Sequence, residues 1–122
     1  MKKKELQYQK WVRKMYDKYA PILFIEKYHL KVTRTTEFKY LASKFNYPYL
    51  DLEILYTDDP IKDWEKDKKD AERRIIHEFC HAITDPFYNT IIQWPTKTAI
   101  EDARERLNDH IAQIVNKHFN LL

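Results

Sequence analysis

The residues of this chain best suited to chemistry form one stretch, His77-Glu78-Phe79-Cys80-His81. Two histidines four positions apart on a helix lie one turn above each other on the same face. Two imidazoles in that arrangement can take two of the four positions around a tetrahedral zinc ion. The glutamate after the first histidine can then reach a metal-bound water as general base. The pattern therefore predicts a zinc site at His77 and His81, with Glu78 as the catalytic residue.

The helix expected around this stretch has two faces. At about 100° per residue, its apolar face carries Ile75, Ile76, Phe79 and Ile83, with Cys80 and Ala82 at the edges. Its other face carries His77 and His81, with Asp70, Arg74 and Asp85. Such a polar face is either solvated or turned toward a site. Cys80 points away from the histidines, and we expect a small buried residue there and not a nucleophile.

A zinc hydrolase usually needs three protein ligands, so one must come from outside this helix. Glu101 lies twenty residues after His81, on the next expected helix, and two antiparallel helices could bring it against the histidines. Glu105, one turn later, is the alternative ligand, or it could accept a hydrogen bond from a ligand imidazole. Asp85, one turn after His81, is a weaker candidate. The spacing favours Glu101.

The stretch from Ile75 to Asp85, together with Glu101, resembles the zincin metallopeptidases, whose signature is His-Glu-x-x-His. The placement of Glu101 is similar to that of the third ligand in gluzincins, and Ala82-Ile83-Thr84-Asp85 is similar to thermolysin-type sequence. The order of elements over roughly residues 22–115 resembles small zincin-like proteins of phages and mobile elements. The resemblance implies a minimal zincin-like domain over residues 1–122.

The resemblance also implies a mechanism. His77, His81 and Glu101 would hold zinc, and Glu78 would take a proton from the attacking water and pass it to the leaving amine. The peptide substrate would lie extended along the edge strand of the sheet, for which residues 49–56 are the candidate. The candidate donors to the oxyanion are Tyr56, Tyr88 and His110.

Composition narrows the class of protein. The chain has no glycine, which excludes phosphate loops, dinucleotide fingerprints, nucleophile elbows and the extended metzincin pattern. Left-handed backbone positions must therefore be filled by Asn or Asp, or avoided. One cysteine excludes an internal disulfide. Because no stretch suits a signal peptide or a membrane span, we expect a cytoplasmic protein without membrane contact.

Apolar spacing predicts the elements of an α+β fold. Residues 2–19 have helical periodicity up to Pro21, whereas the apolar run 22–27 could be a short helix or a strand. Alternating apolar residues predict three strands, near 28–33, 38–42 and 50–56, and their short connections suggest an antiparallel sheet.

The second half of the chain is expected to be helical. One helix should run from about 61 to 84 and end at Asp85-Pro86, followed by an apolar loop over 86–97. The last helix should begin near Thr96 or Thr98 and run to Phe119. Its expected core stripe is Ile100, Ala103, Leu107, Ile111 and Ile114, with Glu101, Glu105 and Asn108 on a neighbouring stripe.

Three functions remain open at this point. The first is a zinc-dependent metallopeptidase, which the presence of Glu78 favours because a structural zinc site would not need it. The second is a catalytically silent zincin-fold binding or accessory protein of a phage or mobile element. The third is a metal-free protein that binds nucleic acid through its basic N-terminal helix, since lysines and arginines there account for most of the net charge of +3. No nucleic-acid motif supports the third hypothesis.

Overall fold

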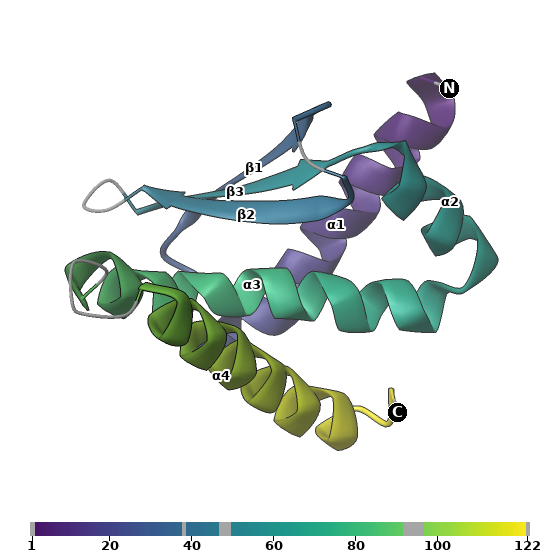
Figure 1. The fold of residues 1–122 in the computed structure, drawn as a ribbon. Helices are drawn as coiled ribbons and strands as arrows, with labels where there is room; N and C mark the ends of the chain where they lie inside the picture. The colour runs from purple at the N-terminus through teal and green to yellow at the C-terminus, as the bar shows by residue number, and fades with distance from the viewer. Residues whose placement is uncertain (1, 38, 47–49, 92–96, 122) are drawn as a thin grey trace.

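The computed structural model describes residues 2–37, 39–46, 50–91 and 97–121. It has an α+β fold in which helix α3 (Lys68–Ile91) lies between a three-stranded sheet and helix α4 (Lys97–His118) (Figure 1). Helix α1 (Lys2–Leu23) runs behind the sheet and α3 and contacts both. The apolar face of α3 meets this core, where Ile75, Ile76 and Phe79 are fully buried. The expected α+β class and the general layout of the elements are confirmed.

The sheet is mixed and not antiparallel. Its strands are β1 (His29–Arg34), β2 (Leu41–Asn46) and β3 (Asp51–Tyr56), in the spatial order β1-β3-β2. Strand β3 pairs parallel to β1 and antiparallel to β2. The expected antiparallel meander is wrong because β3 inserts between the two strands that precede it. The second strand also lies later than the expected 38–42.

The predicted edge strand, residues 49–56, is therefore also wrong, because β3 occupies the centre of the sheet. Leu52, Ile54 and Tyr56 are fully buried, whereas β1 alternates between exposed and half-buried positions. A strand with this much apolar surface is most stable between two neighbours. The edge of the sheet next to α3 is formed by β2.

The long helix expected over 61–84 is divided into two. Helix α2 (Asp58–Lys66) ends at Asp67, whose backbone is extended, and α3 begins at the next residue. Oδ1 of Asp67 accepts a hydrogen bond from the backbone N–H of Asp70 at 3.1 Å, which is the geometry of a helix N-cap. Asp67 caps the start of α3 and lets the chain change direction there. The spacing of the apolar residues does not reveal this break, because it continues from α2 into α3.

Two prolines lie within helices that were expected to end before them. Helix α1 continues past Pro21 to Leu23, and α3 continues through Pro86 to Ile91, where a loop was predicted. Proline removes one N–H donor and restricts the preceding residue, but packing of the neighbouring turns can outweigh that cost. The rest of the predicted loop, residues 92–96, lies outside the described residues. The last helix has close to its predicted bounds.

Helix α4 faces α3 with the stripe beside the one that was expected. Of the predicted core stripe, Ala103 is exposed, Leu107 is 48% exposed and Ile114 is 58% exposed, and the side chain of Ile100 lies outside the described part. The buried residues of α4 are Asn108, Ala112, Val115 and Asn116. The prediction is therefore wrong at Ala103, Leu107 and Ile114, because α4 is rotated toward the neighbouring stripe, whereas Ile111 is half-buried and packs against the core as expected.

Left-handed positions occur despite the absence of glycine. Phe24, Leu50 and Asn120 have φ values of 59°, 58° and 59°. The expectation of Asn or Asp holds for Asn120 and is wrong for the other two. Phe24 ends α1 in a Schellman motif, with the N–H of Ile25 donating to the carbonyl of Ala20 at 2.9 Å. This hydrogen bond stabilises the left-handed backbone of Phe24, a conformation that phenylalanine otherwise disfavours.

Candidate metal centre

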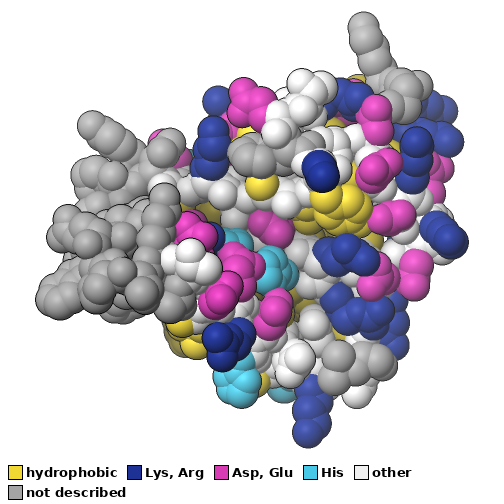
Figure 2. Space-filling model, in the orientation of Figure 1, with side chains coloured by type: hydrophobic (Ala, Val, Ile, Leu, Met, Phe, Trp, Pro, Cys, Tyr) yellow, Lys and Arg dark blue, Asp and Glu magenta, His cyan; other side chains and the backbone are white. Residues whose placement is uncertain are grey.

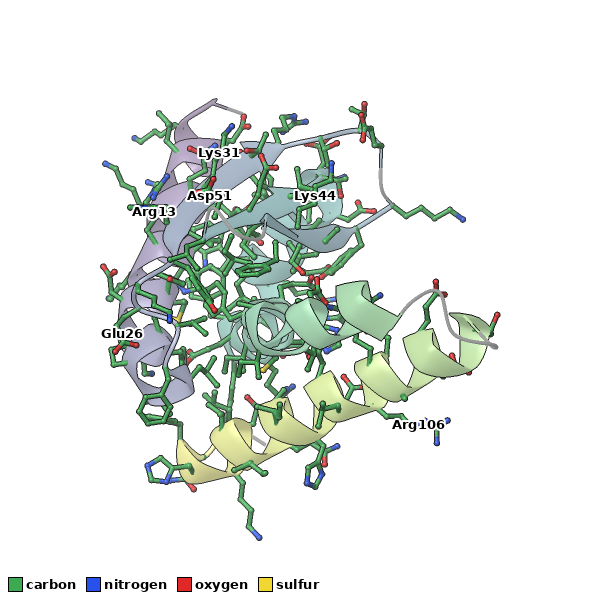
Figure 3. The ribbon with its side chains drawn as sticks, turned by 90° about the vertical axis from the view of Figure 1, so that its left-hand side faces the viewer. Arg13, Glu26, Lys31, Lys44, Asp51 and Arg106 are labelled. Carbon is green, nitrogen blue, oxygen red and sulfur yellow. The ribbon has the colours of Figure 1, made fainter. Side chains whose placement is uncertain are left out.

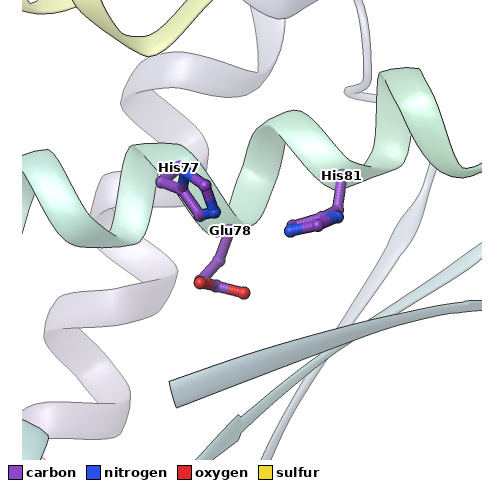
Figure 4. A group of neighbouring side chains, drawn as sticks. All are labelled: His77, Glu78 and His81. Atoms are coloured by element: carbon purple, nitrogen blue, oxygen red, sulfur yellow. The ribbon is translucent and has the colours of Figure 1, made fainter. Parts of the chain in front are cut away.

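His77 and His81 project from consecutive turns of α3 on the same face, with Glu78 beside them (Figure 4). The two imidazole centroids are 5.3 Å apart. One ligand atom from each of the three side chains lies within 4.8 Å of the others, and this group can hold a metal ion. The two histidines therefore share one face of α3, as expected, and this face carries a group that can hold a metal ion.

Each imidazole is held from behind by a carboxylate. Nδ1–H of His77 donates to Oδ1 of Asp109 at 2.8 Å, and Nδ1–H of His81 donates to Oδ1 of Asp85 at 3.0 Å. A carboxylate can only accept, so a proton on Nδ1 of each ring serves these two contacts. Nε2 of both rings faces Glu105, and each offers a lone pair to a metal when it carries no proton.

A third carboxylate faces the two Nε2 atoms. Oε2 of Glu105 lies 3.1 Å from Nε2 of His77, and Oε1 lies 3.5 Å from Nε2 of His81. Glu101 lies one turn earlier on α4 and is half-buried. The contacts therefore favour Glu105 over Glu101 as a third ligand, and they give Asp85 the role of a hydrogen-bond acceptor for His81. The choice of Glu101 from spacing alone remains a prediction without support from these contacts.

Glu78 is 9% exposed and lies between α3 and β2. Burial raises the pKa of its carboxyl group, and the nearby charges of His81 and His77 partly oppose this effect. Raised basicity is the property that a carboxylate needs to accept a proton near neutral pH. The pKa of His81 is also raised: burial lowers it, but the hydrogen bond to Asp85 and the charge of Glu78 outweigh burial.

These side chains line an open groove of about 380 Å³ between β2 and α4, with α3 as its floor. Its residues are Leu41, Ala42, Ser43, His77, Glu78, His81, Asp85, Arg104 and Glu105. Figure 2 shows histidine side chains near the centre of this face, with acidic side chains around them. The groove gives a ligand direct access to the metal-binding group.

None of the predicted oxyanion donors is described at the groove. The hydroxyl of Tyr56 donates to Glu5 of α1 at 2.7 Å and does not line the groove, and His110 is exposed on α4. The side chain of Tyr88 lies outside the described part. The cation that does line the groove is Arg104, 3.7 Å from Asp85 and 3.5 Å from Glu105.

Sequence reasoning missed Asp109, Arg104 and Ser43. Asp109 is four residues after Glu105 and so shares its helical face, which is the signal that could have identified it. It was missed because the core stripe of α4 was placed incorrectly. Ser43 carries no comparable signal, because its position depends on which strand forms the edge of the sheet.

Comparison with known proteins identifies no relative. No family model, no curated protein and no solved structure matches the chain. The resemblance to zincins therefore rests on the residues of this chain alone. Among the described residues, none of the helices combines the length and apolar character needed to cross a lipid bilayer.

Proposed function

We propose that this protein is a zinc-dependent peptidase that hydrolyses peptide bonds in the groove between β2 and α4. The observation that carries the proposal is the convergence of the Nε2 atoms of His77 and His81 with the carboxylate of Glu105, 3.1 and 3.5 Å away. Two imidazole nitrogens and a carboxylate are a donor set that zinc uses in catalytic sites. Glu78 stands beside this donor set without being needed as a ligand.

In the proposed mechanism, His77, His81 and Glu105 would hold the metal, and Asp109 and Asp85 orient the two imidazoles. Zinc supplies a Lewis acid that lowers the pKa of water and polarises a carbonyl group. Glu78, which lies beside His77 and His81 in the groove, accepts the proton of the attacking water. Glu78 then delivers the proton to the leaving amine, which completes hydrolysis of the amide bond.

The proposed substrate is an extended peptide that pairs with the free edge of β2. Among the described strands, β2 pairs only with β3, so its other edge can bind a further strand. Ala42 and Ser43 line the groove beside Glu78. A peptide added at this edge would present its backbone carbonyls to the metal-binding group.

Metal content tests the ligand set. We expect about one zinc ion per chain in the purified wild-type protein by elemental analysis, and a loss of zinc in the Glu105→Ala variant. Glu101→Ala is the matched control from the same helix and should keep its zinc. Loss of zinc from Glu101→Ala with retention in Glu105→Ala would restore Glu101 as the ligand, and absence of zinc from the wild type after reconstitution would overturn the proposal.

Turnover tests the role of Glu78. We expect Glu78→Gln to bind zinc as the wild type does but to cleave a mixed peptide library more slowly by a factor of about 10² to 10⁴, the usual contribution of a general base. Cleavage products counted by mass spectrometry give the rates. Equal rates for the two proteins would contradict the assignment, and a zinc-loaded wild type that cleaves nothing would favour the catalytically silent binding protein.

A further inference from the structure

The groove continues beyond the metal-binding group. A second cavity of about 430 Å³ shares His77, Glu78 and Leu41 with the first. Its other lining residues are Tyr40, Arg73, Arg74, Asp109, Ala112, Gln113 and Asn116. The groove therefore extends along α3 toward the N-terminal half of the helix, away from His81. An extended peptide bound at β2 would pass over this second cavity.

Arg74 is the exposed cation in the wall of this second cavity. It precedes His77 by three positions and Glu78 by four, so it lies about one helical turn from the proposed centre of catalysis. Its guanidinium carbon lies 5.1 Å from the centroid of the Tyr40 ring. Its Nε–H donates to Oδ2 of Asp70 at 2.8 Å. These two contacts hold the guanidinium in one orientation.

The fork of the Arg74 guanidinium remains open to a ligand. Among the described residues, its hydrogen bonds go to Asp70 alone and only through Nε. The two terminal nitrogens, Nη1 and Nη2, form the edge that binds a carboxylate with two parallel hydrogen bonds. The neighbouring Arg73 is engaged differently, because its terminal nitrogens donate to the carbonyl of Leu121 and to Asp70.

A second unsatisfied group lines the same cavity. Asn116 is 5% exposed, and its Oδ1 has no hydrogen-bond donor within the part of the chain that the structure describes. A buried acceptor without a donor is uncommon in folded proteins. A carboxylate supplies the acceptor that the open fork of Arg74 lacks, and this partner does not depend on the enclosed oxygen of Asn116.

The distances assign a place to that carboxylate. Arg74 and Glu78 lie one helical turn apart, which is about 5–6 Å. An extended peptide advances about 3.3 Å per residue. The carboxylate therefore lies within about two residues of the bond that is cleaved. Antiparallel pairing is the more stable choice at an edge strand. A peptide antiparallel to β2 runs toward Leu41 and Tyr40, so the residues at Arg74 follow the scissile bond.

We propose that Arg74 is a specificity-determining residue that binds a carboxylate of the peptide substrate, located one or two residues after the scissile bond. The carboxylate belongs either to an acidic side chain or to the C-terminus of the peptide. The inference rests on the proposed function, because it names the substrate class of the same groove.

Peptide binding to the Glu78→Gln variant tests this inference without turnover. The probes are three fluorescein-labelled five-residue alanine peptides: one amidated and neutral, one amidated with a single glutamate, and one with a free C-terminus. Fluorescence anisotropy, with and without added zinc, gives a dissociation constant for each peptide. We expect a carboxylate peptide to bind about tenfold more tightly than the neutral peptide, the effect of a charge-assisted pair of hydrogen bonds.

Variants of the arginine supply the controls. Adding Arg74→Gln should abolish the preference for a carboxylate, and Arg74→Lys should reduce it, because lysine keeps the charge but not the fork. Arg106→Gln is the matched control, since Arg106 extends from α4 away from the body of the molecule (Figure 3). It should leave the preference unchanged. The peptide that shows the preference identifies the source of the carboxylate.

Equal binding of the three peptides, binding of none of them, or a preference that survives Arg74→Gln would overturn the inference. These outcomes are separate from failure of the proposed function. A carboxylate preference in Glu78→Gln would stand even if the wild type hydrolysed no peptide. Hydrolysis by the wild type without any carboxylate preference would overturn the role of Arg74 and leave the peptidase intact.

Discussion

The two imidazoles of the candidate centre are oriented before any metal arrives. Nδ1 of His77 and Nδ1 of His81 form hydrogen bonds with Asp109 and Asp85, which fixes the orientation of both rings. A metal ligand that is free to rotate must lose that freedom on binding, and these contacts remove part of the cost beforehand. Affinity at this site thus depends on residues that need not touch the metal.

Asp109 provides a direct test at the scale of one residue. We expect Asp109→Asn to weaken zinc binding by about 10- to 100-fold, because an amide oxygen holds the Nδ1–H of His77 less strongly than a carboxylate. Competition with a chromogenic chelator measures the affinity. Asp102→Asn, at an exposed position of the same helix, should bind zinc as the wild type does. An unchanged affinity for Asp109→Asn would mean that the contact does not orient the ring.

The sequence predicts part of this site and not the rest, for identifiable reasons. The spacing of His77 and His81 is local, and a helix converts it directly into a shared face. The partner carboxylate depends on how α4 is rotated about its own axis, and the apolar pattern of α4 suggested the wrong rotation. Glu105 and Asp109, which share one face of α4, could therefore not be chosen over Glu101 from spacing.

At the scale of elements, α4 joins the hydrophobic core through Ala112 and Val115 and also forms a buried polar contact with α3. The hydroxyl of Thr84 donates to the side-chain oxygen of fully buried Asn108 at 2.8 Å. Such pairs require matched partners and so fix the rotation of α4 more strictly than apolar contacts do. The same orientation leaves Leu107 and Ile114 exposed, which explains why a search for apolar periodicity misplaced the helix.

The end of α1 offers a test of backbone strain. Phe24 has a φ of 59° and is 82% exposed, so its ring contributes little packing. Glycine avoids the left-handed penalty of about 1–2 kcal/mol, and we expect Phe24→Gly to raise the free energy of unfolding by about 1 kcal/mol, measured by urea denaturation. Asn120→Gly is the control at the equivalent position of α4, and it should change little because asparagine tolerates this conformation. A destabilised Phe24→Gly would show that the ring makes a contribution to folding.

The elements themselves were more predictable than their connections. Strand positions 29–34 and 51–56 and the bounds of the last helix follow from local periodicity, which packing reinforces. Strand order does not follow, because periodicity specifies which face of a strand is buried and not which strand lies in the middle. The break at Asp67 was missed for a similar reason. Its capping hydrogen bond marks a change in the direction of the chain, which the spacing of apolar residues does not record.

At the scale of the molecule, the proposed zinc site joins two helices. Helix α3 lies between the sheet and α4, whereas α4 packs on the outside of α3. His77 and His81 come from the central helix α3, whereas Glu105 comes from α4, the last helix. We expect saturating zinc to stabilise the fold by roughly 4 kcal/mol at a thousandfold excess over the dissociation constant, which raises the melting temperature by roughly 10 °C or more.

Thermal unfolding followed by circular dichroism, with zinc and with a chelator, measures this shift. The Glu105→Ala variant should show a much smaller shift, because the remaining ligands come from α3 alone. A wild type whose melting temperature does not respond to zinc would contradict the linkage of α3 to α4.

The position of Cys80 has a practical consequence. Its side chain is fully buried on the apolar face of α3, and burial raises the pKa of the thiol to about 12. Since it is the one cysteine of the sequence, no other thiol competes for a thiol reagent. A maleimide or a disulfide dye can react with it only after the core around α3 opens. The rate of that single labelling reaction therefore measures how often the core around Cys80 opens.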